Sequence, residues 1–121
     1  MKRVFICSSW RDDDYLKEII KCNNTKEYCK FACLNGVAAF APQIFYTQFL
    51  HDCIDPEKKL ISECTFTYLG YCNEIWVFAD FNEDIDEYMQ KEIEFAKSKN
   101  ITVRYFTTSM VERTFDDGIK G

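Results

Sequence analysis

The stretch EIWVFA, residues 74–79, is the clearest strand in the sequence, because it is short, apolar and rich in aromatic and branched side chains. Working outward from this strand, the chain contains three more runs of this kind: RVFIC (3–7) and VAAF (37–40) before it, and ITVRYF (101–106) after it. A helical pattern separates each strand from the next. Strands that alternate with helices favour right-handed crossovers and a parallel sheet. The sequence therefore predicts a three-layer α/β domain of flavodoxin or Rossmann-like type, with strand order 2-1-3-4.

The helical segments have recognisable ends. Asp12-Asp13-Asp14 is expected to cap a first helix, with Tyr15, Leu16, Ile19 and Ile20 on its apolar side and an interruption at Asn23-Asn24. A second stretch ends at Asn35-Gly36. Asp55 is expected to cap the next helix, ahead of Pro56, and a last helix reaches Lys99. We expect one domain over residues 1–121, with residues 107–121 as a polar, peripheral tail.

Composition narrows the possible functions. Hydrophobic residues make up 47% of the 121 residues and the net charge is −5, which predicts a folded domain and argues against binding of polymeric nucleic acid. The apolar start is too short for a signal peptide, and no run approaches the ~20 residues of a membrane span.

The odd number of cysteines indicates reduced thiols and a cytoplasmic protein. Cys29 and Cys33 share a helix face, but no second pair completes a zinc site, so we expect no metal.

In the predicted topology the ligand crevice lies at the carboxyl ends of the strands, between the first and the third. Ser8, Ser9, Trp10 and Arg11 follow the first strand there. Hydroxyl groups, backbone amides and an arginine at this position are suited to phosphate or ribose oxygens. An ordinary turn with an exposed arginine explains the same residues equally well.

Aromatic residues follow the second strand. Pro42 ends that strand, and Phe45, Tyr46 and Phe49 lie in the stretch from Gln43 to Cys53, read as a loop or short helix. These rings are able to stack on a nucleobase. The alternative is a patch that packs in the core or against another subunit.

Acidic residues follow the third strand. Asp80, Asp84 and Asp86 lie before a helix, where carboxylates also serve as simple caps. Glu92 occupies the stripe beside the core face, so we expect it half-buried among aromatic rings, with a raised pKa and a potential role as nucleophile or acid. The competing interpretation, which spacing alone favours, is a surface glutamate paired with Lys91 or Lys99.

Other common catalytic patterns are missing. His51 is the only histidine, and nothing in the sequence places it beside a nucleophile. No GxGxxG or P-loop pattern is present, so neither a dinucleotide cofactor nor any other cofactor is expected.

Six motifs in order resemble a known family: VFICS (4–8) followed by Arg11, YCKFA (28–32), AP (41–42), TQFL (47–50), EIWVF (74–78) and EIEFA (92–96). Over residues 2–106 the chain resembles a family of small bacterial and phage proteins that is similar in fold to nucleoside 2-deoxyribosyltransferases. The resemblance implies that Glu92 is the nucleophile that attacks the anomeric carbon and that Asp86 assists. The superfamily of nucleoside 2-deoxyribosyltransferases usually has glycine where this chain has Tyr88, and proline where this chain has Ser9.

The expected function is binding of a nucleoside or nucleotide derivative at the carboxyl edge of the sheet, with cleavage or transfer of its N-glycosidic bond through a glycosyl-Glu92 intermediate. One alternative is a non-catalytic phage-type protein that sequesters a nucleotide immune signal of ADP-ribose type. Another is a structural protein with a vestigial pocket.

A homo-oligomer is expected, with residues 43–53 at the contact. The residues expected to bind the ligand are Ser8, Ser9, Trp10, Arg11, Pro42, Phe45, Phe49, Asp80 and Tyr88.

Overall fold

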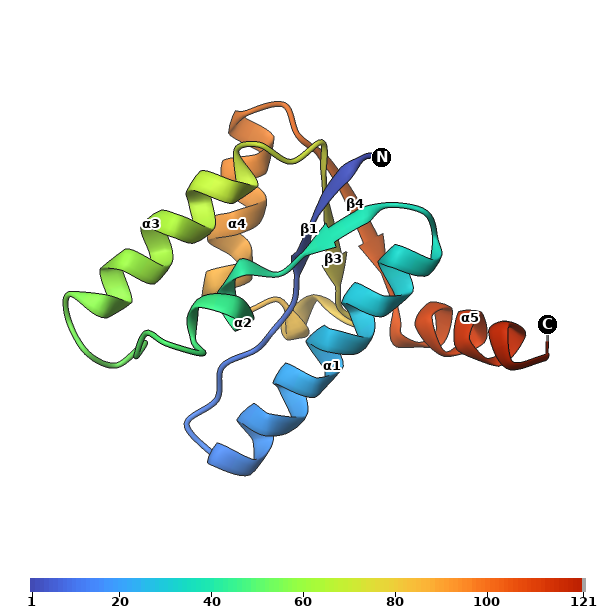
Figure 1. Cartoon of the computed structure of the whole chain (residues 1–121), viewed down its shortest axis with the longest axis horizontal. Helices are drawn as coiled ribbons and strands as arrows, with labels where there is room; N and C mark the ends of the chain where they lie inside the picture. The colour runs from blue at the N-terminus through green and yellow to red at the C-terminus, as the bar shows by residue number, and fades with distance from the viewer. Residues whose placement is uncertain (121) are drawn as a thin grey trace.

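Four parallel strands form the centre of the structure, a computed structural model that describes the backbone of residues 1–120 and the side chains of residues 1–114 (Figure 1). The strand order is β2-β1-β3-β4, which confirms the predicted α/β fold. The strands are β1 (Arg3–Cys7), β2 (Ala38–Phe40), β3 (Glu74–Phe78) and β4 (Thr102–Phe106). The helices are α1 (Tyr15–Leu34), α2 (Pro42–Tyr46), α3 (Glu57–Leu69), α4 (Glu87–Ser98), α5 (Thr108–Lys120) and a short 3₁₀ turn, η1 (Asn82–Asp84).

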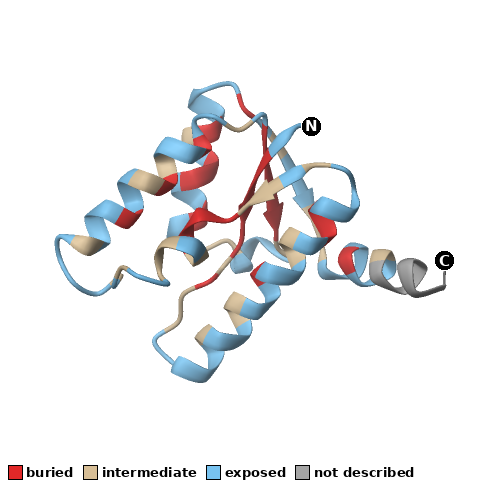
Figure 2. Ribbon diagram, in the orientation of Figure 1, coloured by how far each residue is buried: buried red, intermediate tan, exposed pale blue. Residues whose placement is uncertain are grey.

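Helices cover both faces of the sheet because alternate side chains of the central strands point in opposite directions. Phe5 and Cys7 of β1 pack in a core with α3 and α4. Val4 and Ile6 pack in a second core with α1 and with Val111 of α5. Figure 2 shows the result, with burial concentrated on β1 and β3 and on the inner faces of the helices.

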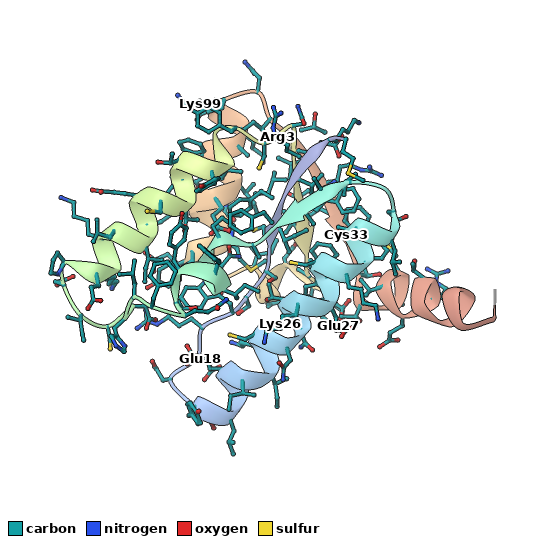
Figure 3. The ribbon with its side chains drawn as sticks, viewed as in Figure 1. Arg3, Glu18, Lys26, Glu27, Cys33 and Lys99 are labelled. Atoms are coloured by element: carbon teal, nitrogen blue, oxygen red, sulfur yellow. The ribbon has the colours of Figure 1, made fainter. Side chains whose placement is uncertain are left out.

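The topology brings the loops after the strands to one edge of the sheet. β1 pairs in parallel with β2 and with β3, so the chain leaves all three strands at the same edge. Arg3 and Lys99, labelled in Figure 3, lie at the opposite edge, where β1 begins and α4 has ended. Any site built from the loops after the strands therefore lies far from those two residues.

The first helix differs from the prediction. α1 is a single helix through Asn23-Asn24, because two asparagines lower helix propensity by only about 1 kcal/mol together and do not stop a helix packed on a sheet. Asp14 caps it through its carboxylate, and Gly36, at φ 84°, follows its end as predicted. Tyr15, Leu16, Ile19 and Ile20 are exposed, which contradicts their predicted burial: this part of α1 extends past the sheet (Figure 1).

The start of α3 also differs from the prediction. α3 begins at Glu57 with Pro56 at the N-cap position, so Asp55 is not the cap; the chain is already turning, with Lys58 N bonded to Ile54 O at 2.9 Å. The polar tail from residue 107 forms α5, and buried Val111 fixes this helix to the core. Within residues 1–120, no helix is both long enough and apolar enough to cross a membrane.

Candidate functional site

Two hollows lie side by side at the carboxyl edge of the sheet. The first, which we call the acidic hollow, has a volume of about 700 Å³. Seven carboxylates line it against two cationic side chains, so it strongly favours positive charge. Its lining residues after β1 and β3 include Ser9, Arg11, Asp80, Asp86 and Tyr88, with Tyr28 and Thr108 beside them.

The second hollow, which we call the Glu92 pocket, has a volume of about 540 Å³, within the range of small-molecule sites. It lies between α3 and α4, and Trp10 and Arg11 of the loop after β1 form part of its wall. The side chains that line it are Trp10, Arg11, Gln43, Asp52, Asp55, Lys58, Lys59, Ile61, Ser62, Thr65, Phe66, Glu87, Tyr88, Lys91 and Glu92.

Arg11 and Tyr88 form the boundary between the two hollows, since both residues line both of them. Arg11 Nη1 donates to the Tyr88 hydroxyl at 2.6 Å, and its guanidinium lies 5.8 Å from the centre of the Tyr88 ring. Arg11 Nε also pairs with Asp52 at 2.9 Å. The arginine is therefore held by two partners, and Tyr88 separates Asp86 from Glu92.

Glu92 lies deep in its pocket, with 6% of its surface exposed. This burial raises its pKa to about 8; a hydrogen bond with Cys7 acts in the opposite direction, and the charge of Asp86 adds to the rise. Burial, followed by the Glu92 charge, raises the pKa of the Cys7 thiol well above its usual value. Glu92 and Cys7 therefore form a buried pair, in which the carboxyl group and the thiol both keep their protons near neutral pH.

Two polar atoms of the Glu92 pocket have no hydrogen-bond partner among the described residues: Gln43 Oε1 and Thr65 Oγ1. Both residues are almost fully buried, at 2% and 4% exposed. The amide group of Gln43 is fixed, because its Nε2 donates to Ile6 O at 3.0 Å. An unpaired buried oxygen costs about 1–3 kcal/mol, which a polar ligand or water in the pocket would recover.

Hydrogen bonds and an ion pair with α1 fix the loop after β1. Ser8 Oγ and Thr25 Oγ1 are 2.6 Å apart, and Asp14 Oδ1 accepts from Leu16 N at 3.0 Å. Lys21 bridges to Asp12 at 3.0 Å. Ser8 therefore uses its hydroxyl to anchor the loop, while Ser9, Trp10 and Arg11 line the hollows.

The aspartates after β3 make structural hydrogen bonds. Asp86 Oδ1 accepts from Met89 N at 2.9 Å as the N-cap of α4, and Asp84 Oδ2 accepts from Phe81 N at 2.9 Å. Asp80 accepts from Thr108 N at 2.8 Å, at the start of α5. In the part of the chain that the structure describes, no three acidic, cysteine or histidine side chains are arranged to hold a metal.

The structure brings together some of the predicted site residues and leaves others apart. Trp10, Arg11, Tyr88 and Glu92 line the Glu92 pocket, and Asp86 with Asp80 lines the acidic hollow. Pro42, Phe45 and Phe49 line neither hollow, and neither does Ser8. Phe45 and Phe49 instead pack edge to face at 5.5 Å, at the surface. Glu92 has no ion pair among residues 1–114; Lys91 pairs with Glu87 instead.

Sequence reasoning missed Gln43, Thr65 and Lys58. Gln43 follows the second strand directly after Pro42, so the rule that strand ends meet at one edge was sufficient to find it. Thr65 is a polar residue between Ile61 and Leu69 on the buried stripe of α3, and a polar residue on such a stripe is a signal. Lys58 shows no sequence signal beyond its position in the first turn of a helix.

The family follows from a comparison with known sequence families. The model described as "Domain of unknown function (DUF7768)" matches residues 2–106. The chain belongs to this family. The match spans all four strands and α1 to α4, so the DUF7768 domain contains both hollows except for Thr108. No curated protein gives a significant match.

A solved structure shares the fold of this DUF7768 member. It is a 2-deoxyribosyltransferase from the psychrotolerant bacterium Bacillus psychrosaccharolyticus, described as a biocatalyst for industrial synthesis of antiviral and antitumoral nucleosides. The TM-score is 0.61 with 11% sequence identity, over 87% of this chain and 72% of that chain. At this identity the likeness is one of fold, which agrees with the resemblance found in the sequence.

Proposed function

We propose that the protein binds a nucleoside or nucleotide derivative in the Glu92 pocket and cleaves or transfers its N-glycosidic bond. The observation that carries this proposal is a buried glutamate in a pocket that also holds two unpaired polar atoms. Burial of polar groups without partners costs free energy, and a polar ligand would recover part of that cost. The fold shared with a 2-deoxyribosyltransferase supports the choice of ligand class.

In the proposed reaction a carboxylate oxygen of Glu92 bonds to the anomeric carbon, while the bond from that carbon to the base nitrogen breaks. The bonding electron pair leaves with the base, which takes a proton from water, while Asp86 lies across Tyr88 in the neighbouring hollow and caps α4. Water or a second base then attacks the same carbon and releases Glu92. Because the pKa of Glu92 is about 8, the group must first lose its proton at neutral pH.

The test is turnover of a panel of nucleosides and nucleotides, followed by chromatography of the released base. We expect Glu92→Gln to lose at least about 100-fold in rate, because the amide cannot form the glycosyl ester. We also expect the wild-type rate to rise with pH until about pH 8, as Glu92 ionises.

Glu94→Gln is the matched control, since Glu94 lies two residues further along α4 and is exposed. This variant should keep the wild-type rate. Turnover that persists unchanged in Glu92→Gln or Glu92→Ala would refute the nucleophilic role. A rate that falls as pH rises towards 8 would instead assign Glu92 as a general acid.

A second candidate function is binding without turnover, the sequestration of a nucleotide signal of ADP-ribose type. The observation that favours it is the Arg11–Tyr88 contact, which separates Asp86 from Glu92 into two hollows. Mass spectrometry after incubation and denaturation distinguishes the two. Recovery of intact ligand supports sequestration, and recovery of free base supports the reaction.

A further inference from the structure

The two hollows differ in charge, and only one of them suits an anion. Carboxylates outnumber cations seven to two in the acidic hollow. In the Glu92 pocket four cationic side chains face four carboxyl groups, and Glu92 is largely protonated at neutral pH because its pKa is about 8. The Glu92 pocket therefore carries a small excess of positive charge beside a strongly negative hollow.

Most of that pocket's charges are already neutralised by a neighbour. Arg11 pairs with Asp52, Lys91 with Glu87 at 3.3 Å, and Lys59 weakly with Glu63 at 3.9 Å. Lys58 has no ion pair with any residue from 1 to 114. Asp55, three residues earlier, is also unpaired there and opposes an anion.

The N-terminus of α3 offers free backbone donors next to this pocket, which Lys58 and Lys59 line and Glu57 does not. Its N-cap residue, Pro56, has no side-chain cap, and α3 is 13 residues long. Lys58 N and Leu60 N donate to Ile54 O and Pro56 O, whereas Glu57 N and Lys59 N donate to no described atom. Unpaired N–H groups and a helix dipole at one end of a pocket are the usual features of a phosphate site.

The inner part of the same pocket independently indicates a ligand. Thr65 Oγ1 and Gln43 Oε1 are buried and unpaired there. Lys58, Ser62 and Thr65 lie along one stripe of α3, and seven residues of helix span about 10 Å. This length is comparable to the distance between the base and the phosphate of a nucleoside monophosphate.

We propose that the Glu92 pocket takes a phosphorylated ligand, with the phosphate at the N-terminus of α3 against Lys58 and Lys59, and the uncharged part against Gln43, Thr65 and Glu92. The identity of that uncharged part as a nucleoside rests on the function proposed above. The phosphate makes charge-assisted hydrogen bonds with the Lys58 side chain, which has no ion pair among residues 1–114, and with the free N–H groups. Asp55 weakens these contacts without abolishing them.

The experiment is isothermal titration calorimetry of the full chain at fixed ionic strength, with the four 2′-deoxynucleosides and their 5′-monophosphates as probes. We expect at least one monophosphate to bind about tenfold more tightly than its nucleoside. Lys58→Ala should remove most of this preference without changing nucleoside affinity. Asp55→Asn should strengthen binding of the monophosphate.

Lys97→Ala is the matched control, because Lys97 is an exposed helical lysine that lines neither hollow. It should leave both affinities unchanged. Lys58 is also exposed, so its removal should not affect folding, which a thermal melt checks.

Each result assigns the failure to one proposal. Nucleosides that bind as tightly as their monophosphates overturn the phosphate site and leave the proposed function standing. If the double variant Lys58→Ala and Lys59→Ala still binds the monophosphate more tightly than the nucleoside, the phosphate site is also overturned. If inorganic phosphate binds as tightly as any monophosphate, the pocket holds an anion alone, and the proposal of a phosphorylated ligand is overturned. If no probe binds, the phosphate site is overturned, and the base-release assay described above decides the proposed function separately.

Discussion

At the residue scale, the buried carboxyl group of Glu92 affects the stability of the protein. The folded protein retains the Glu92 proton until about pH 8, whereas the unfolded chain loses it near the ordinary value of 4.5. Between these two values the folded state binds one more proton than the unfolded state. Rising pH therefore favours unfolding across this interval, and stability from this group is greatest below about pH 4.5.

We predict that the wild type loses on the order of a few kcal/mol of unfolding free energy, relative to Glu92→Gln, between pH 5 and pH 8.5. The glutamine variant retains the shape of the side chain but does not titrate. Urea unfolding at several pH values measures the difference. Glu94→Gln should parallel the wild type, and parallel curves for wild type and Glu92→Gln would contradict the raised pKa.

The position of Glu92 was predictable in part. Its place beside the core stripe of α4 indicated half-burial, and the structure shows almost complete burial. The difference comes from β1, because Cys7 packs against α4 and contacts Glu92 from another part of the chain. Spacing within one helix does not report what packs against it.

At the element scale, one buried hydrogen bond connects the end of β1 to α1. Thr25 Oγ1 donates to Lys21 O at 3.0 Å and lies 2.6 Å from Ser8 Oγ, and both residues are buried. Removal of the threonine hydroxyl leaves Ser8 without a partner in the core. Such an unpaired group costs about 1–3 kcal/mol.

We therefore predict that Thr25→Val lowers the free energy of unfolding by about 1–3 kcal/mol in chemical denaturation. Thr67→Val is the control, because its exposed hydroxyl bonds Glu63 O within α3 and no side chain among residues 1–114. It should change stability by less than about 0.5 kcal/mol. Equal effects of the two variants would show that the Ser8–Thr25 bond does not stabilise the connection.

At the scale of the whole molecule, aromatic rings gather on one surface formed by β2, α2 and α3. Phe45, Phe49 and Tyr68 are exposed, and Phe40 packs against both Phe45 and Tyr68, at 5.8 and 5.4 Å. A contiguous apolar patch of this kind often contacts another molecule. The expected homo-oligomer through residues 43–53 stays a prediction, and this aromatic surface is where we place the contact.

Sedimentation across a range of protein concentrations tests this prediction. The mass should rise above the monomer value with concentration, and Phe49→Ser should shift the midpoint to higher concentration by about tenfold or more. Tyr71→Ser provides the control, since Tyr71 is exposed but makes no ring contact among residues 1–114. A monomer mass at every concentration would contradict the homo-oligomer.

The sequence by itself determined the four strands, their order and the edge of the sheet at which the two hollows lie. Short apolar runs and the helices between them specify a parallel sheet through local pattern and the handedness of crossovers. These features depend on neighbours along the chain, and residues 3–7 and 74–78 show them plainly.

Only the tertiary structure decided how that edge is divided. The Arg11–Tyr88 contact joins residues 77 positions apart, and Gln43 meets Thr65 and Glu92 in one pocket from three different elements. The physical reason is that burial, pKa and hydrogen-bond pairing depend on what packs from other layers. The same reason explains why Phe45 and Phe49, although near a strand end in sequence, lie at the surface outside both hollows.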